Sequence, residues 1–129
     1  MDPLSTYDPD REPNPQAWLE IDETERLKWV KRFHVQAKIR MPNVTAHAAL
    51  HLIVENQIAL GVECTVGAIA RLMGQGLSRH DAIHAVSSVY CEHFYEQAHG
   101  RAKDSSEALW ASCSAAIEQL SAKDWLAKR

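Results

Sequence analysis

Residues 46–60, AHAALHLIVENQIAL, place apolar side chains on every side of a helical wheel. A helix of this kind is normally buried among other helices, because no face of it suits water. Its main polar stripe is formed by His47, His51 and Glu55, which follow one another at a spacing of four residues. Apolar residues flank the stripe on both sides, so we expect the stripe to be buried inside a helical bundle.

The segment 79–98 repeats this pattern. His80 and His84 are again four residues apart, in RHDAIHAVSSVYCEH, and the stretch after them is mostly apolar or small. On a helix, the face that carries these two histidines also carries Ser87, Cys91 and Tyr95. Glu92 lies at the edge of that face. This segment therefore predicts a second core helix with a polar stripe of its own.

Buried polar groups need partners, and two buried stripes satisfy each other most economically when they face one another. We therefore expect the two helices to pack with their histidines together. Neutral imidazole is a common ligand for Zn, Fe, Ni, Cu and Mn, and carboxylates complete many such sites. The candidate metal ligands are His47, His51, His80, His84, Glu55 and Glu92. Zn, Fe, Mn and Ni are the candidate cofactors, and Gln57 or a serine hydroxyl could orient the ligands from outside.

Two other interpretations of the histidines stay open. In the first, they form a metal-free hydrogen-bond network with Glu55 and with Ser87 or Ser88, which would make them structural. In the second, the helix pair responds to pH, because buried histidines titrate near neutrality. His34 lies on the apolar stripe of a preceding helix and could reach the cluster, although the sequence favours an ordinary core histidine there.

Helix start and stop signals recur along the rest of the chain. They predict a short helix from Pro15 and one over 23–38, then a helix from Asn43 or Thr45 to Gly61. They also predict a shorter helix from Thr65, one over 78–99 and a last one from Asp104 or Ser105. The only candidate strand, residues 62–66, is short and interrupted by Glu63. The fold class is therefore all-α, a compact bundle of about five helices. Four of the five prolines lie within residues 1–15, which predicts an extended arm over residues 1–14, and 15–129 form a single domain.

Length, charge and composition exclude several classes of protein. The chain has 129 residues and a net charge of −3, which gives no basic footprint for nucleic acid. No apolar run approaches the ~20 residues that span a membrane. The three cysteines form no CxxC pair, which is typical of reduced core thiols in a cytoplasmic protein. The proline-rich arm or the last helix is the candidate surface for a protein partner or for a second copy of the chain.

Known catalytic motifs are mostly missing. The His47–His51 motif lacks the glutamate of HExxH zinc proteases. His80 and Asp81 form a doublet like that of all-α metal-dependent phosphohydrolases, which need a later aspartate, here Asp104 or Asp124. Asp81 is also explained by a capping box with Ser78. Cys91 beside the histidines suggests a Cys–His pair less than it suggests an inert core thiol.

Three stretches, YDPDREPNPQAWLEIDETER, HAALHLIVENQIALG and RLMGQGLSRHDAIHAVSSV, resemble a family of small bacterial proteins of unknown function. The likeness covers roughly residues 7–97. It implies a first His-x-x-x-His followed by glutamine, at His47, His51 and Gln57. It implies a second with a later glutamate, at His80, His84 and Glu92. The family varies at the position of Glu55, and it implies no substrate.

The sequence thus predicts a protein that binds metal through a histidine-rich centre between two core helices, with hydrolytic or redox chemistry as its enzymatic options. The alternative is a non-enzymatic interaction or regulatory helical module in which the buried histidines are structural. Whether the chain is an enzyme is left open by its motifs.

Overall fold

The computed structural model describes residues 7–37, 43–100 and 105–128, and every regular element among them is a helix. The all-α prediction is therefore confirmed for this part of the chain. The helices are α1 (Pro15–Glu20), α2 (Glu23–Gln36), α3 (Val44–Ala59), α4 (Glu63–Gly74), α5 (Arg79–Ala98), α6 (Ser106–Gln119) and α7 (Ala122–Ala127).

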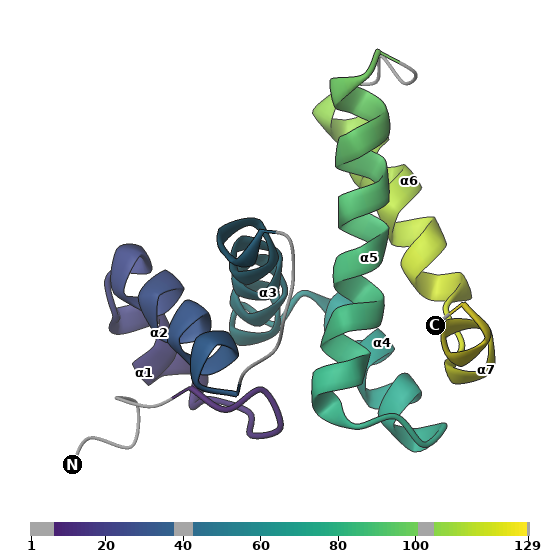
Figure 1. Ribbon diagram of the computed structural model, residues 1–129. Helices are drawn as coiled ribbons and strands as arrows, with labels where there is room; N and C mark the ends of the chain where they lie inside the picture. The colour runs from purple at the N-terminus through teal and green to yellow at the C-terminus, as the bar shows by residue number, and fades with distance from the viewer. Residues whose placement is uncertain (1–6, 38–42, 101–104, 129) are drawn as a thin grey trace.

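The two histidine helices lie at the centre of the arrangement. Helix α3 packs against α1, α2 and α5, whereas α5 packs against α3, α4 and α6 (Figure 1). The apolar core accordingly has two parts. One, which includes Trp18, Val30 and Leu52, joins α1–α3, and the other, which includes Ile83 and Ile117, joins the helices from α3 onward. The contact between α3 and α5 holds these two parts together, as their apolar sequences predict.

Side-chain caps account for most of the helix starts. Asn43 accepts a hydrogen bond from the Ala46 amide at the start of α3, and Ser105 caps α6 in the same way. Ser78 accepts from the amide of Asp81 at the start of α5. Each cap satisfies an amide that the first turn of a helix leaves without an intrahelical partner. The predicted starts at these residues are confirmed.

The number of helices differs from the predicted five. The described residues form seven: the six whose starts the sequence marks, the short α1 among them, and one more because the predicted last helix is interrupted after Gln119. Leu120 adopts an extended backbone, and Ser121 then caps α7 by accepting from the amide of Asp124. Helix α4 begins at Glu63 rather than at Thr65. The Thr65 hydroxyl is not a cap there and instead donates to Oε1 of Gln57, at 2.6 Å.

The described part of the N-terminal segment, residues 7–13, lies against the domain rather than extending from it. The amide of Arg11 donates to the carbonyl of Asp8 at 3.0 Å, which closes a tight turn. Tyr7 and Pro9 are buried. The predicted arm is therefore a folded segment over these residues, and its first six positions lie outside the described residues.

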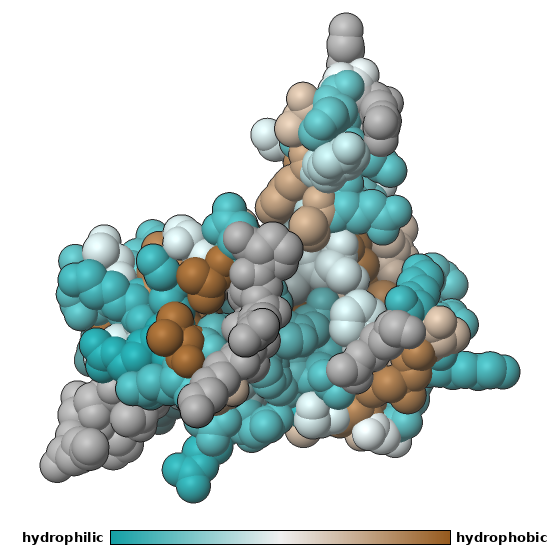
Figure 2. All heavy atoms as spheres, viewed as in Figure 1, coloured by the Kyte–Doolittle hydropathy of each residue, from teal (hydrophilic) through white to brown (hydrophobic). Residues whose placement is uncertain are grey.

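The surface seen in Figure 2 is mainly hydrophilic, with apolar side chains in small separate patches. Among the described residues, no single helix has the length and apolar composition needed to cross a membrane. Helices α3 and α4 satisfy that test only when they are taken together as a pair bent by 104°.

Candidate metal centre

Five histidines from three helices meet between α2, α3 and α5. His34 comes from the last turn of α2, His47 and His51 from α3, and His80 and His84 from the first turns of α5. The centroids of the His80 and His84 rings are 4.2 Å apart, and those of His34 and His84 are 6.4 Å apart. The spacing of four residues therefore places each predicted pair on one helix face, and α3 and α5 bring the two pairs together.

Four of these residues are arranged as a metal site would require. His34, His51, His80 and His84 each offer one ring nitrogen, and the four atoms lie within 4.8 Å of one another. Two nitrogens bound to one ion at ~2.1 Å can be at most about 4.2 Å apart. In a tetrahedral site the same bond length places the nitrogens about 3.4 Å apart, so the widest pair would have to approach by roughly 1 Å or more, through rotation of the rings, for all four to bind one ion.

His47 lies at the edge of this group. Its Nε2 atom is 3.0 Å from Nε2 of His84, which makes the two rings direct neighbours. One of these nitrogens can donate a hydrogen to the other, or both can turn their lone pairs toward one cation. His47 is also half-buried, whereas His51 on the same helix is fully buried.

Three nitrogens of the group lack a protein partner. Nε2 of His34, of His51 and of His80 is buried and makes no hydrogen bond to any described residue. A buried polar atom without a partner costs roughly 1–3 kcal/mol, so native proteins rarely contain three at one place without a reason. All three residues belong to the close group of four, so a cation bound there could provide the partner that the protein does not.

The tautomer of His34 follows from its contacts. Its Nδ1 atom lies 2.8 Å from the carbonyl oxygen of Val30, one turn earlier on α2. A carbonyl can only accept, so Nδ1 carries the hydrogen of the neutral ring. Nε2 is then a bare lone pair, which is the form that binds a metal.

The tautomer of His51 follows from a chain of polar groups. Tyr7 donates its hydroxyl hydrogen to Oε2 of Glu55, at 2.5 Å, because an ionised carboxylate can only accept. The Tyr7 oxygen is therefore left to accept from Nδ1 of His51, at 3.4 Å. Nε2 of His51 again keeps its lone pair. A partner that fixes the ring in this way is the usual outer shell of a metal-bound histidine.

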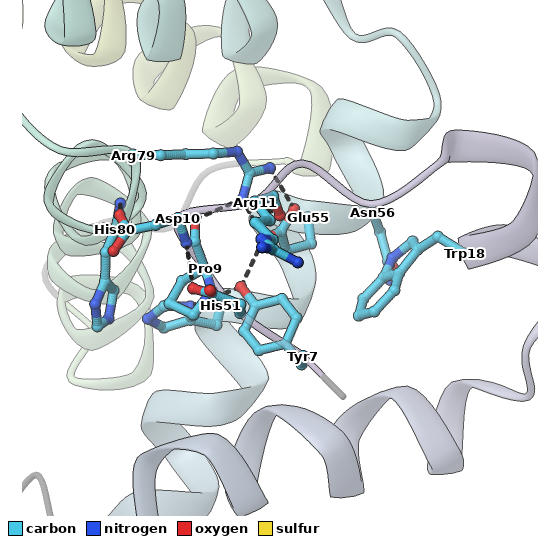
Figure 3. A network of polar contacts seen from close by, with 11 residues as sticks. Tyr7, Pro9, Asp10, Arg11, Trp18, His51, Glu55, Asn56, Arg79 and His80 are labelled. Atoms are coloured by element: carbon cyan, nitrogen blue, oxygen red, sulfur yellow. Dashed lines mark hydrogen bonds and ion pairs between the residues drawn. The ribbon is translucent and has the colours of Figure 1, made fainter. Parts of the chain in front are cut away.

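Glu55 itself is engaged by groups outside the histidine cluster. Its two oxygens accept from Nη1 and Nη2 of Arg79, at 2.8 and 2.7 Å, and both side chains are buried. Nη1 of Arg79 also donates to the carbonyl of Pro9 at 2.8 Å. Figure 3 shows this network of Tyr7, Glu55 and Arg79 beside the rings of His51 and His80. The geometry makes Glu55 an anchor for Tyr7 and Arg79 rather than one of the grouped ligands.

Four histidines of the cluster, His34, His47, His51 and His80, have a lowered pKa, which favours their neutral form. Burial lowers the pKa of His51, and the neighbouring His84 and His34 lower it further. Burial is also the first cause of the lowered pKa of His47, to about 4, with contributions from His34 and His80. The pKa values of His34 and His80 are lowered by burial as well. His80 is the second residue of α5, where the positive end of the helix dipole also disfavours a protonated ring.

Glu92 and Gln57 lie elsewhere than the cluster's centre. Glu92 is exposed and lines a cavity that His47 and His84 also line, but it does not belong to the close group of four. Gln57 accepts from Tyr90 at 2.9 Å through the same oxygen that accepts from Thr65. It is therefore committed to a network of its own, whereas Tyr7 is the residue whose hydroxyl lies within hydrogen-bond distance of His51.

The remaining catalytic suggestions gain little from the structure. The amide of Asp81 donates to Ser78, as a capping box requires, and Asp124 lies in the first turn of α7. Asp104 lies outside the described residues. All three cysteines are free thiols, but only Cys113 is buried, so the prediction of three core thiols is wrong for the exposed Cys91.

Three residues of the site were missed or given less weight by the sequence. His34 joins the group because α2 packs along α3. Tyr7 reaches it through the folded N-terminal segment, which no local pattern predicts. Arg79 could have been predicted. It is a cation next to the buried polar stripe of its helix, and Glu55 is an acid on the facing helix, so the two would be expected to pair.

Comparison of the sequence with protein-family models, and comparison of the chain with curated proteins and with solved structures, finds no match.

Proposed function

We propose that this protein binds a divalent transition metal through His34, His51, His80 and His84, with His47 at the edge of the site. The observation that carries the proposal is that three of the four closely grouped histidines have a buried Nε2 atom without a protein partner. The hydrogens held on Nδ1 of His34 and His51 strengthen it, because they leave Nε2 of each ring as an acceptor only.

A metal-free network would need donors at the centre of the cluster. Acceptor lone pairs cannot hydrogen-bond to one another, and the lowered pKa values of the histidines oppose a proton there. Glu55, which the network hypothesis used as a partner, is occupied by Arg79 and Tyr7. A cation with two positive charges supplies what the four imidazoles lack.

The donor set favours some metals over others. The grouped side chains are all imidazoles, which suit Zn, Fe, Ni and Cu, whereas Mn prefers carboxylate oxygens. Of the four metals expected from the sequence, Zn, Fe and Ni therefore fit better than Mn. A bound ion of this kind would supply Lewis-acid activation of an oxygen for hydrolysis, or one-electron chemistry in the case of iron.

The decisive experiment is elemental analysis of untagged protein purified without chelator. We expect close to one Zn, Fe or Ni per chain, and we expect His51→Ala and His84→Ala to lose it. His99→Ala is the matched control, because His99 is exposed and its Nδ1 bonds to the carbonyl of Tyr95 at 2.8 Å, away from the cluster. Circular dichroism would establish that each variant is still folded.

A protein that neither contains metal nor takes it up on titration would overturn the proposal. The alternative function, a helical interaction module with structural histidines, would then be favoured. In that case His51→Ala should change only stability, by ~1–3 kcal/mol, through the polar groups left without partners.

A further inference from the structure

A cavity of about 480 Å³ adjoins the histidine cluster. It lies between α3, α5 and α7, and its walls include Leu50, Ser87, Glu92 and Trp125. Cavities of roughly 300–1,000 Å³ with mostly apolar walls and a few polar groups are the usual form of small-molecule sites. This one has the volume and the composition to hold an organic molecule.

Two histidines belong to both the cavity and the cluster. His47 and His84 line the cavity, and their Nε2 atoms are 3.0 Å apart. His84 is also one of the four grouped ligands. A molecule in the cavity would therefore meet the metal site at the edge formed by this pair.

Two polar atoms of residues in the cavity wall have no partner. Oγ of Ser87 and Nε1 of Trp125 are buried and make no hydrogen bond within the described part of the chain. Ser87 is only 5% exposed. By contrast, the neighbouring Ser88 donates to the carbonyl of Ala85 at 2.7 Å. Both atoms have essentially no accessible surface, so they lie behind the wall and do not face the space of the cavity.

The charge of the metal site indicates the sign of the ligand. Four neutral imidazoles leave both charges of a divalent ion uncompensated, and the buried acid Glu55 is already paired with Arg79. Glu92 in the cavity wall is exposed to solvent, which screens its charge more than that of a buried group. An anionic oxygen on the ligand would offset this charge in partly buried surroundings. The apolar side chains of Leu50 and Trp125 suit a ring or a short hydrocarbon body.

We propose that this cavity binds a small organic anion, with an apolar body and a carboxylate or phenolate oxygen directed at the metal beside His47 and His84. The inference rests on the proposed metal site and names the class of molecule that this site would act on or sense.

The test is calorimetric titration of the metal-loaded protein with benzoate, and with benzyl alcohol as the neutral counterpart. We expect benzoate to bind in the micromolar to millimolar range, roughly −8 to −4 kcal/mol, and benzyl alcohol at least about tenfold more weakly. Leu50→Trp should fill the cavity and abolish benzoate binding. Leu126→Trp is the matched control, because Leu126 is on α7 and 52% exposed, outside the cavity wall.

Metal content is measured first for each variant, which separates the two proposals. A variant that retains metal but no longer binds benzoate supports the cavity as the ligand site. Wild-type protein that holds metal but binds no benzoate up to about 10 mM would overturn the ligand inference and leave the metal site standing. Benzoate binding that is equally strong in Leu50→Trp would also overturn it. Protein without metal would instead count against the proposed function.

Discussion

The hydroxyl of Tyr7 donates a 2.5 Å hydrogen bond to Oε2 of Glu55, across 48 positions of the sequence. This bond determines which way the tyrosine hydrogen points, and so leaves the oxygen free to accept from Nδ1 of His51. The Glu55 carboxylate is in turn held by Arg79. A residue of the N-terminal segment thus sets the tautomer of a histidine in the core.

The first prediction concerns this arrangement. In Tyr7→Phe, Nδ1 of His51 loses its acceptor, and the affinity for Zn should fall by ~10–100-fold, as for other outer partners of metal ligands. Competition with a chromophoric chelator measures that affinity. Tyr90→Phe is the control, because Tyr90 is also buried but bonds to Gln57. An equal loss of affinity in both variants would mean that general destabilisation, and not the tautomer of His51, is responsible.

The second prediction separates Glu55 from the metal ligands. Glu55→Gln should reduce the free energy of unfolding by about 3–5 kcal/mol, because it leaves the buried Arg79 guanidinium without its carboxylate. Urea denaturation measures this change. The folded fraction should still bind one metal ion. The double variant Glu55→Gln/Arg79→Met should be more stable than Glu55→Gln alone. If folded Glu55→Gln protein binds no metal, Glu55 must be one of the metal ligands and the prediction is wrong.

Much of the helical framework could be predicted from the sequence, because its signals are local. Caps such as Asn43, Ser78 and Ser105 act within three residues of themselves, and the structure confirms them. The meeting of His51 with His84 could be predicted as well, since two buried polar stripes have few other ways to be satisfied. The interruption between α6 and α7 was missed although Ser121 and Asp124 carry the spacing of a cap.

The less predictable parts of the site depend on long-range packing. His34 enters the cluster only because α2 lies along α3, and its own sequence context looks like that of any core histidine. The sequence predicts Glu55 as a metal ligand because it continues the stripe of His47 and His51. Its engagement by Arg79 and Tyr7 depends on a helix and a segment that sequence spacing does not place. Periodicity thus indicated which face was polar but not which polar groups would pair.

The third prediction tests His34 as a ligand. His34→Ala should weaken metal binding by more than the ~10–100-fold expected for an outer partner, because it removes a donor atom. His93→Ala is a close control. Nδ1 of His93 lies 2.8 Å from the carbonyl of Val89, as that of His34 does from Val30, but its Nε2 lies beside Ser112. Equal metal content in the two variants would exclude His34 from the site.

The fourth prediction is the pH dependence of the metal-free protein. The pKa of His47 is lowered to about 4 and that of His51 is lowered too, mainly by burial, whereas both return to about 6.5 on unfolding. Between these values the unfolded chain binds more protons than the folded one, so stability should be full above pH 6.5 and should fall as the pH drops toward 4. Each such histidine contributes up to ~1.4 kcal/mol per pH unit. Asp8, Asp10 and Asp81 raise the pKa of His80 and oppose part of its shift.

Urea denaturation with chelator at pH 7.5, 6.5, 5.5 and 4.5 measures the trend, and His51→Phe should flatten it. A free energy of unfolding that stays constant from pH 7.5 to 4.5 would show that the histidines are not held neutral by the fold.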